Sequence, residues 1–138
     1  MDFEWSDDQL ALRDSVIKFV ARELTDGAKK EAFSLDHWRR CAELGIQGLS
    51  VPEEYGGQGA SVLTTIAALE ALGYACADNG LLFSLNAHMW AVVHPIRTFG
   101  NAAQKTRYLP GLCNGSLIGA HAMSEPKFRA SIAPANGP

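Results

Sequence analysis

The middle of the chain contains a long stretch with almost no formal charge, and this stretch limits the possible folds more than any other feature. Between Tyr55 and Ile96 the only formally charged side chains are Glu70 and Asp78. The apolar residues there recur at the spacing of two helices. A surface helix normally carries a charged face, which both of these almost lack. We therefore expect both to be covered on more than one side, by further protein or by a ligand, because the rest of a 138-residue chain is too small to cover them.

Helices are predicted along most of the chain. The stripes of the two uncharged helices are formed by apolar residues: Val62, Ile66 and Leu69 after a Ser61 cap, then Leu81, Leu85, Met89 and Val92. A first helix should begin at Ser6, where Gln9 completes a capping box, and end by Gly27. A second should begin after Ser34 and end at Gly45, which suits a left-handed residue after the helix.

Two later segments are predicted to be loops or turns. Leu49–Gly59 contains Pro52 and three glycines, which exclude regular structure. Asn101 should cap a short helix that runs through Gln104, after which Tyr108–Gly115 turns the chain.

The C-terminal part changes character. Leu117–Met123 is the best strand candidate, but no upstream segment offers a partner strand. Residues 127–138 contain two prolines and no periodicity, which predicts a disordered tail. The expected fold is mostly α: a bundle of about five or six helices with one C-terminal strand and that tail. We divide it into a helical domain (1–115), the start of a β-domain (116–126) and a divergent tail (127–138).

Composition excludes several classes of partner. The chain has 12 basic and 15 acidic side chains, a net charge of −3, which argues against nucleic acid. Its three cysteines form no C-x-x-C pair, and its four histidines lack helical pairing, so no metal is expected. The longest uncharged run, Asn79–Ile96, is too polar to cross a membrane. The acidic start, Asp2 and Glu4, is unlike a signal peptide and favours the cytoplasm.

Six short motifs occur in order across most of the chain. They are Val-Pro-Glu-Glu-Tyr-Gly-Gly-Gln-Gly (51–59), Glu-Ala-Leu-Gly (70–73), Pro-Ile-x-x-Phe-Gly (95–100), Gln-Lys-x-x-Tyr-Leu-Pro (104–110), Gly-x-Leu-Ile-Gly (115–119) and Ala-Met-Ser-Glu-Pro (122–126). Together they resemble the acyl-CoA dehydrogenase family, in its N-terminal helical domain and the first strand of its middle domain.

The resemblance implies a flavoprotein that binds FAD and oxidises an acyl thioester between its α and β carbons. A glutamate base removes the α-proton, the β-hydride passes to the flavin, and the electrons leave to an electron-transfer flavoprotein or to oxygen. The implied substrate is an acyl-CoA or an acyl-carrier-protein thioester, and the full-length enzyme would be a homo-oligomer.

Site residues follow from the matching positions. His121, Met123 and Ser124 match positions that contact the flavin ring, and Ser124 is also expected to contact the substrate. His88 lies on the face of Leu81 and Leu85, where it either lines the acyl pocket or is a hydrogen-bonded core residue.

The sequence departs from the family after Pro126. A Gly-Ser-Asp turn should follow, but Ala130 stands at the position of its serine. No glutamate here matches the base, so no catalytic residue is assigned. We expect the chain to be inactive alone, and a frameshift or early stop near codon 127 would explain its tail. Two alternatives stay open: a non-enzymatic helical module that binds an acyl thioester or a partner helix, and a non-functional remnant that aggregates through its exposed apolar helices.

Overall fold

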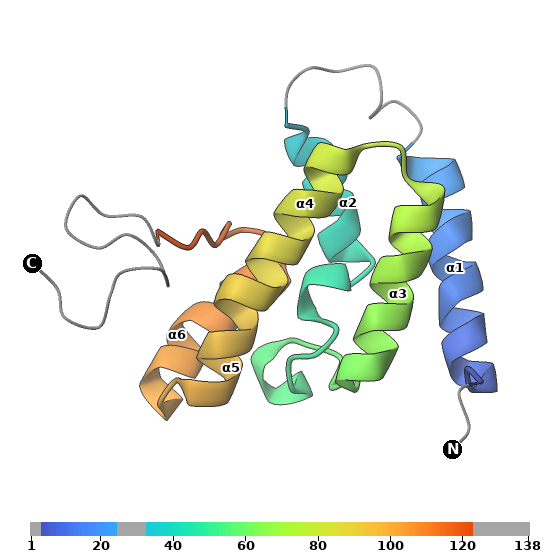
Figure 1. Ribbon diagram of the computed structural model, residues 1–138. Helices are drawn as coiled ribbons and strands as arrows, with labels where there is room; N and C mark the ends of the chain where they lie inside the picture. The colour runs from blue at the N-terminus through green and yellow to red at the C-terminus, as the bar shows by residue number, and fades with distance from the viewer. Residues whose placement is uncertain (1–3, 25–32, 123–138) are drawn as a thin grey trace, which may run out of the picture.

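The computed structural model describes residues 4–24 and 33–122, and in this part of the chain all regular structure is helical (Figure 1). The α-helices are α1 (Asp7–Glu23), α2 (Leu35–Glu43), α3 (Val62–Ala75), α4 (Asn79–His88), α5 (His94–Phe99) and α6 (Ala102–Cys113). Short turns of other helical types are η2 (Ile46–Gly48), η3 (Glu53–Tyr55) and η4 (Met89–Val93). The predicted mostly α class is confirmed.

The predicted helix starts are confirmed by their caps. Ser6 and Asn101 each form a complete capping box with the glutamine three residues later. The Ser34 and Ser61 side chains accept hydrogen bonds from backbone N–H groups in the first turns of α2 and α3. Gly45 follows α2 with a φ of 87°, in the left-handed region that favours glycine. Local sequence therefore sets where these helices begin and where α2 ends.

Helices α1 and α3 run side by side in the same direction (Figure 1). Gln9 donates to the Thr64 hydroxyl near the start of both helices, and Arg13 pairs with Glu70 further along. Between the helices, large side chains of α1 face small residues of α3, which allows the two backbones to approach closely. The buried residues are Val16, Phe19 and Val20 on α1, and Ala67, Ala68 and Ala71 on α3.

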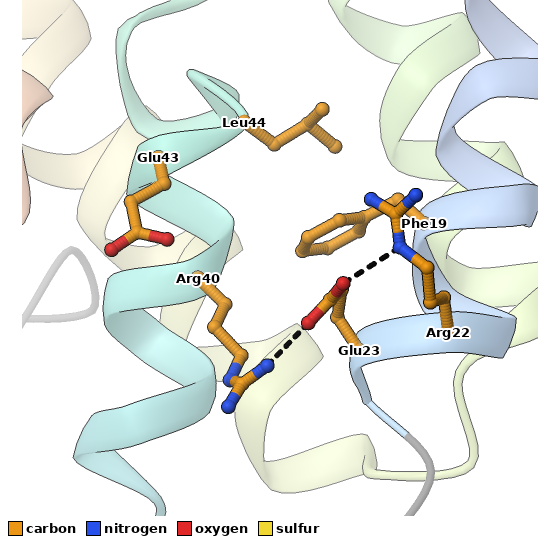
Figure 2. A pocket seen from close by; sticks show the side chains of 6 residues that line it. All are labelled: Phe19, Arg22, Glu23, Arg40, Glu43 and Leu44. Atoms are coloured by element: carbon orange, nitrogen blue, oxygen red, sulfur yellow. Dashed lines mark hydrogen bonds and ion pairs between the residues drawn. The ribbon is translucent and has the colours of Figure 1, made fainter.

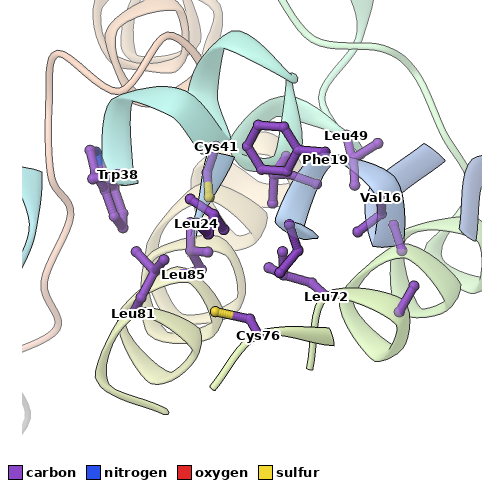
Figure 3. Packing of buried hydrophobic residues seen from close by; sticks show 14 of the residues in the cluster. Val16, Phe19, Leu24, Trp38, Cys41, Leu49, Leu72, Cys76, Leu81 and Leu85 are labelled. Carbon is purple, nitrogen blue, oxygen red and sulfur yellow. The ribbon is translucent and has the colours of Figure 1, made fainter. Parts of the chain in front are cut away.

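The main core lies where α1, α2, α3 and α4 meet (Figure 3). Trp38 and Cys41 of α2, Leu72 of α3, and Leu81 and Leu85 of α4 belong to this cluster, and all five are essentially inaccessible to solvent. A second buried cluster joins η4 and the segment before η3 to α6. It consists of Val51, Val93, Leu109, Leu112 and Cys113. The two clusters hold all six helices together by apolar burial.

The apolar stripe of the second uncharged helix predicted regular helical spacing up to Val92. The structure instead contains a π-helical turn at Met89–Val93. Pro95 follows after one intervening residue, His94, and in a regular helix the proline ring would clash with the carbonyl of Ala91. The wider turn separates these groups while the chain continues helically into α5.

Two further expectations were wrong in detail. The helix after Asn101 does not end at Gln104 but runs to Cys113 with Pro110 inside it. Burial of Leu109 and Leu112 on either side of the proline offsets the helical hydrogen bond that it removes. The loop predicted over Leu49–Gly59 includes the single helical turn η3 directly after Pro52.

The predicted strand Leu117–Met123 is not formed over 117–122, the part that the structure describes. A strand needs a neighbour to complete its hydrogen bonds, and the described chain offers none. Several predictions fall outside the described residues. They concern the helix stop at Gly27, positions 123–126 of the predicted β-domain start, and the tail at 127–138.

The uncharged helices have apolar side chains on their outer faces, as their sequence predicted. Ile66 of α3 keeps 46% of its surface exposed, and Phe83 of α4 keeps 76%. These faces are not covered by any described part of the chain. None of the described helices has the length and apolar character needed to span a membrane.

Candidate functional site

The candidate site is built around residues 115–122, which we call the exit segment. It leaves the end of α6 and runs past α4 (Figure 1, orange to red). Two side chains from distant helices hold it. The Trp38 indole Nε1–H of α2 donates to the Gly115 carbonyl over 3.2 Å, and the Gly119 N–H donates to His88 Nδ1 of α4 over 3.0 Å.

His88 is fully buried, and both of its ring nitrogens are engaged. Because Nδ1 accepts from Gly119, the ring proton lies on Nε2, which donates to the Leu112 carbonyl over 3.1 Å. Burial lowers the pKa of His88, an effect that the Leu112 carbonyl only partly opposes. The imidazole is therefore a neutral, structural group in this arrangement.

Trp38 and His88 also contact each other. Their rings meet edge to face, with centroids 4.9 Å apart and an interplanar angle of 89°. The two side chains thus form one buried unit that touches the exit segment at two points four residues apart. We call this unit the Trp38–His88 clamp.

The residues predicted to contact the flavin lie at or beyond the end of this segment. His121 is exposed to solvent, and Met123 and Ser124 lie outside the described residues. Of the two interpretations of His88, the geometry favours the hydrogen-bonded core residue over a lining of the acyl pocket. The structure therefore brings His88 next to the exit segment but not into an open cavity.

An apolar groove of about 480 Å³ lies between α3 and the α4–η4 helix. Its lining residues are Val62, Ile66, Leu69, Glu70, Asn86 and Trp90. Glu70 forms an ion pair with Arg13, so its carboxylate is already occupied in this structure. The groove offers an apolar surface rather than a set of reactive groups.

A second pocket, of about 250 Å³, lies between α1 and α2 (Figure 2). Glu23 forms ion pairs there with Arg22, over 2.7 Å, and with Arg40. The hydrogen bond from Arg22 lowers the pKa of the Glu23 carboxyl, so this group is a poor proton acceptor near neutral pH. The pocket holds an ion-pair network, and nothing about it indicates general-base chemistry.

Metal and thiol chemistry receive no support in the described chain. No cluster of three or more His, Cys, Asp or Glu side chains in the described ranges could hold a metal ion. Cys41, Cys76 and Cys113 are all buried free thiols. Desolvation raises the pKa of Cys41 to about 12 and that of Cys113 to about 11, which suppresses the reactive thiolate.

Nothing in the sequence singled out Trp38 as a site residue. Its indole N–H finds an acceptor that is 77 positions away in the chain. The Gly115 and Gly119 pair was the available signal. A Cβ on Gly115 would lie 2.8 Å from Ala42 Cβ, and one on Gly119 would lie 2.7 Å from Val92 Cγ1. The motif thus marks two points where the backbone lies directly on the bundle.

The described part of the chain is thus an all-helical bundle with residues 115–122 held against it. The family model "Acyl-CoA dehydrogenase, N-terminal domain" matches residues 6–116, and the chain belongs to this family.

Individual relatives extend the comparison. L-prolyl-[peptidyl-carrier protein] dehydrogenase of Pseudomonas fluorescens is 38% identical over 129 residues, which cover 92% of this chain and 34% of the relative. Mitochondrial isovaleryl-CoA dehydrogenase of Pongo abelii is 36% identical over 133 residues, 92% of this chain and 31% of the relative. The chain spans about a third of the length of the relatives that it matches.

Solved structures show the same fold. The prolyl acyl carrier protein oxidase AnaB superimposes with a TM-score of 0.84 and 45% identity, over 90% of this chain and 34% of that protein. The structure titled "PigA with FAD and proline" superimposes with a TM-score of 0.85 and 35% identity, over 91% of this chain and 34% of that protein.

Proposed function

We propose that this chain is the N-terminal helical domain of an FAD-dependent dehydrogenase that oxidises an acyl thioester between its α and β carbons. The family match over residues 6–116 carries the proposal. Bound FAD supplies the hydride acceptor. The domain's own part is to hold the exit segment, present an apolar wall and exclude water.

Exposure at the end of the exit segment supports a flavin contact there. After the contact at Gly119 the chain leaves the bundle, and His121 and Ala122 are exposed. A planar ring could therefore lie against them. Met123 and Ser124 follow directly, and we propose that these residues and His121 contact the ring, with Ser124 also close to the substrate.

For the substrate we propose an L-prolyl group carried as a thioester on a carrier protein. Two relatives at 38% and 35% identity are named as dehydrogenases of that substrate, and the AnaB oxidase at 45% identity is named for a prolyl acyl carrier protein. Isovaleryl-CoA is the second candidate, because the enzyme named for it reaches 36% identity. An electron-transfer flavoprotein or oxygen would accept the electrons. We further propose that the complete enzyme is a cytoplasmic homo-oligomer.

Reconstitution tests this proposal. Residues 1–138 would be co-expressed with the C-terminal two thirds of the Pseudomonas fluorescens relative, and the purified complex would be examined for flavin absorbance. We expect a yellow complex whose flavin is bleached by L-prolyl-carrier protein. Bleaching by isovaleryl-CoA instead would favour the second candidate, and a colourless preparation would contradict the proposal. The C-terminal part expressed alone is the control.

The 138-residue chain alone should bind no FAD and show no activity, because it supplies one wall of the site. Reading the DNA after codon 126 in all three frames is an independent test. A Gly-Ser-Asp turn in another frame or a neighbouring gene would support a shifted or interrupted coding sequence, and its absence there would contradict that explanation.

The non-enzymatic module makes the opposite prediction. A purified, monomeric chain that melts cooperatively and binds an acyl thioester without flavin would favour it. A chain that is soluble only as large assemblies would instead favour the non-functional remnant.

A further inference from the structure

The Trp38–His88 clamp satisfies backbone groups that ordinary secondary structure leaves open. The exit segment follows a helix and forms no described strand, so its N–H and C=O groups need other partners. His88 supplies the acceptor for the Gly119 N–H, and Trp38 supplies the donor for the Gly115 carbonyl. An apolar side chain at either position would fill the core but leave these groups unpaired.

The contacts also fix which residues of the segment lie at which place. Gly115 has a φ of 74°, and a side chain on it or on Gly119 would collide with the bundle. A slip by one residue would bring Ser116 or Ala120 to these points, where there is no room for a Cβ. The two glycines and the two polar side chains therefore select a single register.

We infer that His88 and Trp38 are positioning residues, which set the register of the exit segment so that His121 emerges at the flavin. The flavin part of this inference rests on the proposed function. The clamp itself does not, because its contacts lie entirely within residues 38–119.

The two ends of the imidazole have different tasks, and this difference gives a matched pair of variants. In His88→Asn the side-chain carbonyl can take the place of Nδ1 and accept from Gly119, while the contact with Leu112 is lost. In His88→Gln the amide can reach the place of Nε2 and donate to Leu112, while the acceptor for Gly119 is lost. Both variants bury an amide, so they should lose similar global stability.

Amide hydrogen exchange of the 138-residue chain, measured by NMR, reads out the clamp. We expect Gly119 to exchange about tenfold faster in His88→Gln than in His88→Asn, the change expected for one hydrogen bond. Trp38→Phe, which keeps an aromatic ring, should accelerate exchange in the exit segment as well. Val16→Ala is the control, because it weakens the core at α1, far along the chain from the clamp, and should affect Gly119 only through global unfolding.

The unmodified chain provides a check that needs no variant. Nitrogen-15 shifts should show His88 as the neutral tautomer with its proton on Nε2. A proton on Nδ1, an unprotected Gly119 amide, or equal exchange in the two His88 variants would overturn the clamp.

Flavin spectra of the reconstituted complex then test the positioning role. His88→Gln should change the visible circular dichroism of the flavin, and His88→Asn should leave it close to that of the unmodified complex. Identical spectra in both variants would overturn the positioning role while the exchange data still supported the clamp. Failure of the unmodified complex to bind flavin would contradict the proposed function, and with it the flavin part of the inference.

Discussion

The Arg13 guanidinium and the Glu70 carboxylate lie 2.8 Å apart and join α1 to the single charged residue of α3. More than half of the Glu70 side chain is exposed, so solvent screens the pair. We expect Glu70→Gln to lower the free energy of unfolding by less than about 1 kcal/mol. A double-mutant cycle with Arg13→Gln, read by urea denaturation, measures the coupling free energy between Arg13 and Glu70. A coupling free energy well above about 1 kcal/mol would contradict a solvent-screened ion pair.

Apolar burial should matter far more than this ion pair. Leu72 is fully buried in the main core, whereas Leu63 of the same helix is 56% exposed. Leu72→Ala should cost about 2–5 kcal/mol, because it leaves a cavity. Leu63→Ala is the matched control and should change the free energy of unfolding by no more than about 0.5 kcal/mol. Urea denaturation of the two variants would give the comparison, and similar losses would argue against the described packing.

The lowered pKa of His88 predicts a stability that depends on pH. In the folded state the ring resists protonation, whereas in the unfolded chain it titrates near its ordinary value of about 6.5. The unfolded state therefore binds more protons as the pH falls below that value, and His88 should reduce stability by up to about 1.4 kcal/mol per pH unit until it protonates in the fold.

Protonation of Nδ1 would also set a second donor against the Gly119 N–H. The measurement is the free energy of unfolding between pH 5 and 8, as a difference from His88→Gln, which lacks the titrating group. A difference that does not change with pH would contradict the prediction.

Gly119→Ala should disturb the exit segment, because the new methyl group would meet the stiff side chain of Val92 at 2.7 Å. We expect a loss of about 1–3 kcal/mol, typical of overpacking. Replacing Val92 by alanine removes the group that the new methyl meets. Gly119→Ala should therefore cost less stability in a Val92→Ala background than in the unmodified chain. Thermal or urea unfolding of the three variants would test this, and purely additive effects would exclude the collision as the cause.

The thiols should be inert while the chain is folded. Burial raises the pKa of Cys41 to about 12, and that of Cys113 to about 11, and also raises the pKa of Cys76. A disulfide reagent added at pH 8 should therefore react only slowly with the native chain. In urea, which unfolds the chain, the reagent should react readily with all three thiols. Rapid native labelling, located by mass spectrometry, would show that the described core opens.

Local signals in the sequence were sufficient for the helix starts. Ser6 with Gln9 and Asn101 with Gln104 form capping boxes from side chains three residues apart, so no tertiary information was needed to predict them. The continuation through Pro110 could not be predicted in this way, because it depends on the burial of Leu109 and Leu112 against distant residues.

The site shows the same division. The uncharged middle helices and the Gly115–Gly119 motif were visible in the sequence, and the exposed Ile66 and Phe83 side chains agree with the expected apolar outer faces. The link between Trp38 and Gly115 was not visible, since it joins residues that only the fold brings together. The predicted flavin contacts of Met123 and Ser124 stay predictions.

The π-helical turn between α4 and α5 has a consequence for the phase of the side chains that follow it. One additional residue in a helical turn rotates every later side chain by about 100° relative to an uninterrupted helix. Because of this rotation, the continuous helical segment from α4 to α5 contributes to both buried clusters. Leu85 lies in the cluster shared with α2 and α3, while Ile96 packs against the cluster that contains Leu109 of α6. A straightened rod would direct one of these two leucine-sized groups into water.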